Sequence, residues 1–340
     1  MIRYVLKRLG ISAITLFGLL VVVFTITRVL PGDAAAARLG PEATPQDIAA
    51  LRAQYGLDRP LSTQFFDYLN KVLHGDLGRS VSTAQSVTTE LLQRLPATLE
   101  LSVLALVIAA LIGFPLGFLG AVRQGTWLDA CVRVYAVLGS SVALFWLGLL
   151  LVYFFFFQFH MFPAPVGRLP IGVQPPPHVT GFYLVDGLVT GHADASWVAF
   201  NQLLLPALTL GLGAAAPILK MVRSAMIQTL SSDYVRAATA LGVPRRTVLF
   251  VDALRNALLP VLTVVGIVVG YLIGGNVIVE FLFSWPGMGR YAYEGLQSND
   301  LEVLQGFVIV VGAMYIVLNL LIDVLYSAID PRIRVGGTAT

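Results

Sequence analysis

The residues with the most chemistry to offer lie in one stretch, 231–260, with the sequence SSDYVRAATALGVPRRTVLFVDALRNALLP. This stretch separates two apolar runs and carries arginines, a tyrosine and an asparagine, all of which are hydrogen-bond donors. Gly242 allows a backbone turn that other residues adopt only with strain. The pattern favours docking onto another protein, since arginine and tyrosine are enriched at protein interfaces.

The sequence lacks the local signatures of catalysis. It contains no GxxxxGKS/T phosphate loop, no GxSxG nucleophile elbow and no HExxH metal motif. One cysteine, Cys131, and four histidines exclude a disulfide within the chain and leave almost no ligands for a metal. His160, His178 and His192 lack i,i+4 spacing, and we interpret them as solvated loop residues. We therefore expect no catalytic residue, metal site or cofactor on this chain.

The composition places these residues in a membrane protein. Hydrophobic residues make up 57% of the chain and charged residues 12%, and the mean hydropathy is +0.80. Those values are too apolar for a soluble globular protein. The formal net charge of +3 gives no reason to expect binding to nucleic acid.

Six apolar runs are long enough to cross a bilayer as helices, because 22 helical residues span about 33 Å. They cover about 9–30, 97–122, 130–159, 201–222, 259–280 and 301–329. The first run lacks an A-x-A-like cleavage site, so we expect a retained helix and not a signal peptide. The sequence predicts an all-α polytopic membrane protein with six transmembrane helices.

The basic residues predict the orientation of these spans. Only Arg168 and Arg290 fall in the two shorter outer loops of a model with the N-terminus inside. The same model places the following residues in the cytoplasm: Arg3, Lys7, Arg8, Arg123, Lys220, Arg223, Arg236, Arg245, Arg246, Arg255, Arg332 and Arg334. By the positive-inside rule, we expect both termini in the cytoplasm.

These spans divide the chain into a tail with the first span, an extracytoplasmic helical segment, a membrane core and a C-terminal tail, at 1–30, 31–96, 97–330 and 331–340. Short amphipathic helices are expected at about 44–56, 62–74 and 86–95, lying against the outer ends of the bundle or contacting a substrate-delivering protein. The core includes a proline-rich outer loop at 160–198 and an aromatic outer loop at 281–300. The aromatic loop fits an interfacial belt, or a loop that dips back toward a pathway.

Polar residues within the spans are scarce and lie near their ends. Asp129 and Arg133 stand four residues apart at the start of the third span and can pair. Small residues are more frequent, and Gly266, Gly270 and Gly274 on one helix face permit close packing. No series of carboxylates or histidines crosses the middle of the membrane, which disfavours an ion-coupled carrier. A membrane-embedded protease is disfavoured because no Asp pair or Ser/His pair lies at depth.

The cytoplasmic connection at 231–258 is predicted to be a helical hairpin. Its first helix should run from 233 to 241, with Ser232 or Asp233 as cap and Gly242 after its end. Its second helix should run from 244 to about 258, with Val248, Val251 and Leu258 on one face.

This hairpin resembles the coupling motif of ABC importer permeases, E-A-A-x-x-x-G followed by I-x-L-P. Arg236-Ala237-Ala238 stands for E-A-A and Gly242 for the glycine. Arg236 replaces the glutamate and Ala253-Leu254-Arg255 occupies the last positions, which is typical of the dipeptide/oligopeptide/nickel subgroup. The stretches HGDLGRS, LPATLELS, LLLPALTLGL, FLFSWPGMGR and DPRIR are also similar, in the same order, to the first permease subunit of that subgroup.

The resemblance implies a type I ABC importer permease fold in the bacterial inner membrane. It implies a second homologous permease, two cytoplasmic ATPase subunits that bind ATP and Mg²⁺, and an extracytoplasmic substrate-binding protein. The implied ATPase-contacting residues are Asp233, Tyr234, Arg236, Ala237, Ala238, Gly242 and Arg255. We further predict Glu280, Trp285 and Tyr291 as residues of the substrate pathway. Peptide is the expected substrate, and nickel, glutathione and oligosaccharide are alternatives.

Overall fold

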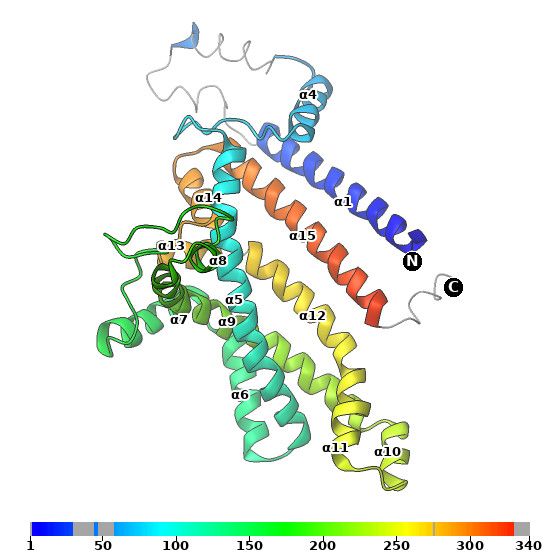
Figure 1. Ribbon diagram of the computed structural model, residues 1–340. Coiled ribbons are helices and arrows are strands. Elements are labelled where there is room, and N and C mark those ends of the chain that lie inside the picture. The colour runs from blue at the N-terminus through cyan, green and yellow to red at the C-terminus, as the bar shows by residue number, and fades with distance from the viewer. Residues whose placement is uncertain (1, 30–43, 47–57, 275, 330–340) are drawn as a thin grey trace. The chain divides into compact units, whose positions relative to one another are not determined.

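The computed structural model describes residues 2–29, 44–46, 58–274 and 276–329 (Figure 1). The chain forms two compact units. The first unit consists of Met1–Leu95 and Tyr291–Leu320, and the second of Pro96–Arg290 and Leu321–Thr340.

The described residues are helical apart from loops and one isolated bridge between Arg79 and Ser86. The α-helices are α1 (Ile2–Val29), α4 (Leu61–Leu73), α5 (Val87–Val122), α6 (Trp127–Ser141), α7 (Leu144–Leu151), α8 (Tyr183–Val189), α9 (Ala193–Leu230), α10 (Asp233–Ala240), α11 (Arg245–Thr247), α12 (Leu254–Gly274), α13 (Val277–Leu282), α14 (Met288–Gln297) and α15 (Leu301–Ile329). Two π-helices, η1 (Val152–Gln158) and η2 (Val248–Ala253), continue α7 and α11.

Within the described residues, five helical stretches are long and apolar enough to cross a membrane: Arg8–Ile26, Val87–Val122, Ala193–Leu230, Arg245–Gly274 and Leu301–Ile322. The predicted third span is instead broken, because α6 and the α7–η1 helix meet at an angle of 108°. The residues before the break are Gly-Ser-Ser, a pattern at which sharp kinks occur, and Val142 and Ala143 are extended. Six spans result if the bent pair counts as one.

Two other expectations about helices are corrected. The predicted short helix at 86–95 is the beginning of α5, which continues through Pro96. The predicted outer loop at 160–198 is irregular only as far as its prolines extend, and it then forms α8 and the start of α9. The helix predicted to open at Thr44 lies largely outside the described residues, although positions 45–46 are helical.

Aromatic and aliphatic packing joins the elements of the first unit. Phe65 of α4 packs edge-to-face against Phe17 and Phe24 of α1, with ring centroids 5.9 and 5.3 Å apart. Leu20 and Val23 of α1 form a buried cluster with Ile309 of α15. The predicted helix at 62–74 is thereby confirmed as α4, and its apolar face covers one end of α1.

α9 is the central helix of the second unit, and most of its residues between Gln202 and Leu219 are buried. Its contact with α5 depends on glycines, because a Cβ on Gly117 would lie 2.8 Å from the carbonyl oxygen of Leu219, and one on Gly211 would lie 3.0 Å from that of Ala105. Such close approach is typical of helix packing in membranes. Since α9 has 38 residues and is about 57 Å long, α8 and α10 lie at its opposite ends (Figure 1).

Candidate functional site

The docking segment, residues 231–258, begins directly after α9. Ser232 holds the cap position of α10, but its hydroxyl donates to the Thr229 carbonyl at 2.6 Å and forms no side-chain cap. Gly242 has φ +78°, as predicted for the residue after a helix end, and its N–H donates to Thr239. Among the described residues, nothing lies within 4 Å of a Cβ built on Gly242. Backbone conformation is therefore the reason for glycine here, and crowding is not.

The predicted contact residues form an exposed surface on this segment. Val235 is the buried residue that anchors α10. The side chains of Asp233, Tyr234, Arg236 and Ala237 are exposed, and Ala238 is half-buried. Asp233 and Arg236 approach each other at 3.9 Å, but both are solvated, so this contact contributes little. α10 thus presents a small polar and basic face.

The second helix of the predicted hairpin does not end near 258. α11, η2 and α12 form one stretch, Arg245–Gly274, so the docking segment is a direct extension of a membrane-crossing helix. The expected common face of Val248, Val251 and Leu258 is wrong, because Val248 is buried while the other two are exposed. The π-helical turn in η2 changes the register between these positions.

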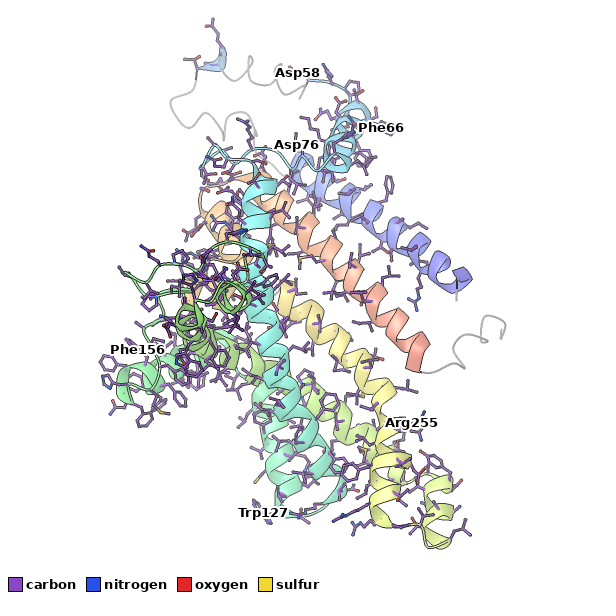
Figure 2. All side chains as sticks on the ribbon, viewed as in Figure 1. Asp58, Phe66, Asp76, Trp127, Phe156 and Arg255 are labelled. Atoms are coloured by element: carbon purple, nitrogen blue, oxygen red, sulfur yellow. The ribbon has the colours of Figure 1, made fainter. Side chains whose placement is uncertain are left out.

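Free cations complete the docking segment. Arg245 and Arg246 are exposed in α11, and Arg255 is exposed at the start of α12 (Figure 2). In the described part of the chain none of the three has an ion-pair partner. Asn256 donates to the Tyr234 hydroxyl at 3.1 Å and joins α12 to α10. The segment can bind an acidic or carbonyl-rich surface without losing internal contacts.

A buried carboxylate connects α6 to α9 in the half of the unit near α10. Asp129 accepts two bonds from Arg223, at 2.7 and 3.0 Å, and a third from the Gly125 N–H at 3.2 Å. The predicted pairing with Arg133 is present but longer, at 3.8 Å. Sequence reasoning missed Arg223 because local spacing does not reveal a partner on another helix.

Two of the predicted pathway residues, Glu280 and Trp285, are buried in the second unit. Glu280 accepts hydrogen bonds from Thr98 Oγ1 at 2.7 Å and from the Arg290 N–H at 2.9 Å. Trp285 donates its indole N–H to the Ala97 carbonyl at 2.8 Å. Their side chains attach the α13–α14 connection to α5. The expected interfacial belt would leave Trp285 facing lipid, whereas it is buried.

Tyr291 is buried in the first unit. Its hydroxyl donates to the Glu90 carboxylate, and the guanidinium of Arg94 lies 4.6 Å from its ring centroid. In the same unit, the buried Asp300 accepts hydrogen bonds from Ser80 Oγ at 2.7 Å and the Val81 N–H at 2.6 Å. These contacts join the segment that precedes α5 to the start of α15.

A second polar cluster was not predicted. Arg168 lies between η1 and α8, in the irregular segment 159–182, called the proline-rich loop, and it donates to the Glu100 carboxylate of α5 at 2.6 Å. The two side chains are 8% and 6% exposed. The sequence signal was a lone arginine in the otherwise uncharged stretch 134–185, and a glutamate at the end of a span.

Comparisons with known proteins match this chain to membrane components of transport systems. The family model described as "Binding-protein-dependent transport system inner membrane component" matches residues 113–335, and the model of the N-terminal part of such components matches residues 1–102. A probable D,D-dipeptide transport system permease protein of Escherichia coli is 43% identical over 320 residues, 94% of each chain. A dipeptide transport system permease protein of Alkalihalophilus pseudofirmus is 38% identical over 98% of this chain and 100% of its own. A glutathione transport system permease protein of Salmonella choleraesuis is 38% identical over 98% and 99%.

Proposed function

The chain belongs to the family of binding-protein-dependent transport system inner membrane components, and we propose that it is the permease subunit of an ATP-driven importer of short peptides. The observation that carries the substrate class is the match to relatives named for dipeptide transport, over 94% or more of both chains. It is a multi-pass protein of the bacterial inner membrane. The proposed orientation has both termini in the cytoplasm, on the side of α10.

The partners follow from the family and from the exposed docking segment. A binding-protein-dependent system includes a substrate-binding protein and an ATPase. We assign two cytoplasmic ATPase subunits, which bind ATP and Mg²⁺, and a second homologous permease. The face formed by Asp233, Tyr234, Arg236 and Ala237 would contact one ATPase, and the free Arg255 would extend that contact. The chain itself would carry no catalytic residue.

Movement of the ATPase can reach the membrane by two routes within the second unit. α10 is joined to α9 by two residues, Ser231 and Ser232, and Val235 packs it against the unit. It is also joined to α12 by the Asn256–Tyr234 hydrogen bond. Displacement of α10 would therefore move α9 and α12 together, and this motion would switch the access of a pathway between the two permeases.

The role of Glu280, Trp285 and Tyr291 in a substrate pathway remains a proposal. Their burial favours support of the pathway wall over direct contact with substrate. Alanine variants that retain the half-saturating peptide concentration but lose maximal transport rate would match this supporting role, and a changed half-saturating concentration alone would match direct contact.

Glutathione is a second candidate substrate, because one relative at 38% identity is named for its transport. Glutathione is itself a tripeptide with two carboxylates, so a thermal-shift screen of the cognate binding protein should include it beside dipeptides and Ni²⁺. The ligand that raises the melting temperature most at equal concentration identifies the class.

The test of the proposed function is uptake by vesicles that contain both permeases and the ATPases, with the binding protein outside. Labelled dipeptide should accumulate only with ATP inside and the binding protein present. Uptake driven by an ion gradient without ATP would instead identify a secondary carrier.

A further inference from the structure

We propose that Glu100 and Arg168 are positioning residues whose buried ion pair holds the proline-rich loop in the form that meets the binding protein. The inference rests on the proposed function, since it uses the proposed orientation and partner. It concerns a different end of α9 from the docking segment, which lies about 57 Å away along that helix.

The pair is unusual because both charges are removed from water. The Arg168 Nη2 to Glu100 Oε2 distance is 2.6 Å, and both side chains are more than nine-tenths buried. Burying two charges carries a desolvation penalty that their attraction often only offsets, so such a pair is weak evidence for stability. A role in fixing a unique geometry explains it better.

The contacts of the pair fasten both ends of the loop to α5. Arg168 directly precedes the exposed part of the loop and also donates, at 3.0 Å, to the carbonyl of Gly181, which follows that part. Its guanidinium lies 3.4 Å from the ring centroid of Tyr183. The second oxygen of Glu100 accepts the Leu184 N–H at 3.0 Å. One residue of α5 therefore binds the loop where it leaves and where it returns.

A second carboxylate fixes the returning end independently. The buried Asp186 of α8 accepts the N–H groups of Val179, Thr180 and Gly181 at 3.2, 2.7 and 2.9 Å. Between this point and Arg168 most of the loop is exposed: Ile171 is 98% exposed, Leu169 and Pro170 are half-buried, and Pro176 is buried. Residues 169–178 contain four prolines and no formal charge. The result is a stiff apolar projection on a fixed base.

The same turn of α5 holds the α13–α14 connection. Ala97 accepts the Trp285 indole N–H, and Thr98 bonds to Glu280 and accepts the Met288 N–H at 2.9 Å. Residues 97–100 thus place two segments of the outer side relative to each other. Loosening the Glu100–Arg168 pair would free one segment and leave the other in place.

The test compares variants in the complete reconstituted transporter. Glu100→Gln leaves the charge of Arg168 buried without its partner and is expected to reduce assembly. The double variant Glu100→Gln/Arg168→Gln removes both charges and should assemble normally. We expect it to raise the half-saturating concentration of binding protein for ATPase stimulation by about tenfold, with an unchanged maximal rate and basal rate. A purely structural pair would change assembly alone.

A variant of Asp186 tests the same loop in a second way, and an exposed ion pair provides the control. Asp186→Asn loosens the loop end without leaving an unpaired buried charge, and it should raise the same half-saturating concentration. The exposed pair Arg59–Asp67, at 3.4 Å, provides the matched control, because Arg59→Gln/Asp67→Asn should change nothing. An unchanged half-saturating concentration in Asp186→Asn, or in an assembled double variant, overturns the inference. Failure of the wild-type complex to respond to binding protein would overturn the proposed function instead.

Discussion

Two arginines share the buried carboxylate of Asp129, and replacing each by glutamine should have very different effects on stability. Arg223 makes two short bonds to it and is 21% exposed, whereas Arg133 lies 3.8 Å away and is 60% exposed. Breaking a buried pair from one side costs about 3–5 kcal/mol, and partial solvation of Arg223 lowers this to roughly 2–4 kcal/mol. A solvated pair four residues apart contributes below about 0.5 kcal/mol.

The assay is unfolding of the purified chain in mixed micelles by increasing SDS, with loss of helix as the signal. Arg223→Gln should lower the free energy of unfolding by roughly 2–4 kcal/mol and Arg133→Gln by less than about 0.5 kcal/mol. Each variant removes one positive charge next to the same carboxylate. The difference between their free energies of unfolding therefore reports the geometry and burial of each arginine. Equal effects, or a loss below about 1 kcal/mol for Arg223→Gln, would refute the argument that this bond joins α6 to α9.

Three other predictions concern packing, pH and hydrogen bonding. Gly117→Ala should destabilise by about 1–3 kcal/mol, since its Cβ would lie 2.8 Å from a backbone oxygen, while Gly18→Ala, with open space in the described residues, should be neutral or stabilising in the same SDS assay. Burial raises the pKa of Asp186, but hydrogen bonds from residues 179–181 outweigh it and lower the pKa from 3.8 to about 2. The order that Asp186 gives to the loop is therefore complete above about pH 4 and lost as the pH falls through about 2, which amide exchange of these residues checks. Trp285→Phe leaves the Ala97 carbonyl without its indole donor and should cost about 1–3 kcal/mol of stability, and a smaller loss would contradict that bond.

The parts of the fold that local chemistry determines could be predicted from the sequence. Glycine is favoured after a helix end, and Gly242 has φ +78° at this position; five of the apolar runs correspond to unbroken helical stretches in the described residues. The bend between α6 and α7 was missed because hydrophobicity is continuous through it. The π-helical η2 was missed as well, since its extra residue per turn leaves no pattern in a short segment.

Within the candidate sites, too, some residues could be predicted from the sequence and others could not. Tyr234 and Arg236 were predicted as contacts from the resemblance of their segment to the coupling motif, and both are exposed. The partner of Glu100 lies 68 residues further along the chain, and that of Asp129 lies 94 residues further. No local spacing encodes such pairs. The burial of Trp285 likewise depends on its contact with the turn of α5 at Ala97, which is distant in sequence.

The central claim, that the docking segment carries motion from an ATPase into the membrane, is tested most directly by one pair of variants. Gly242 and Gly191 both have φ +78°, are exposed and have no neighbour within 4 Å among the described residues, so aspartate imposes the same backbone strain at each. In the reconstituted transporter, Gly242→Asp should abolish ATPase stimulation by binding protein and substrate, while Gly191→Asp should retain it. Equal stimulation in both variants would contradict the coupling role of this segment.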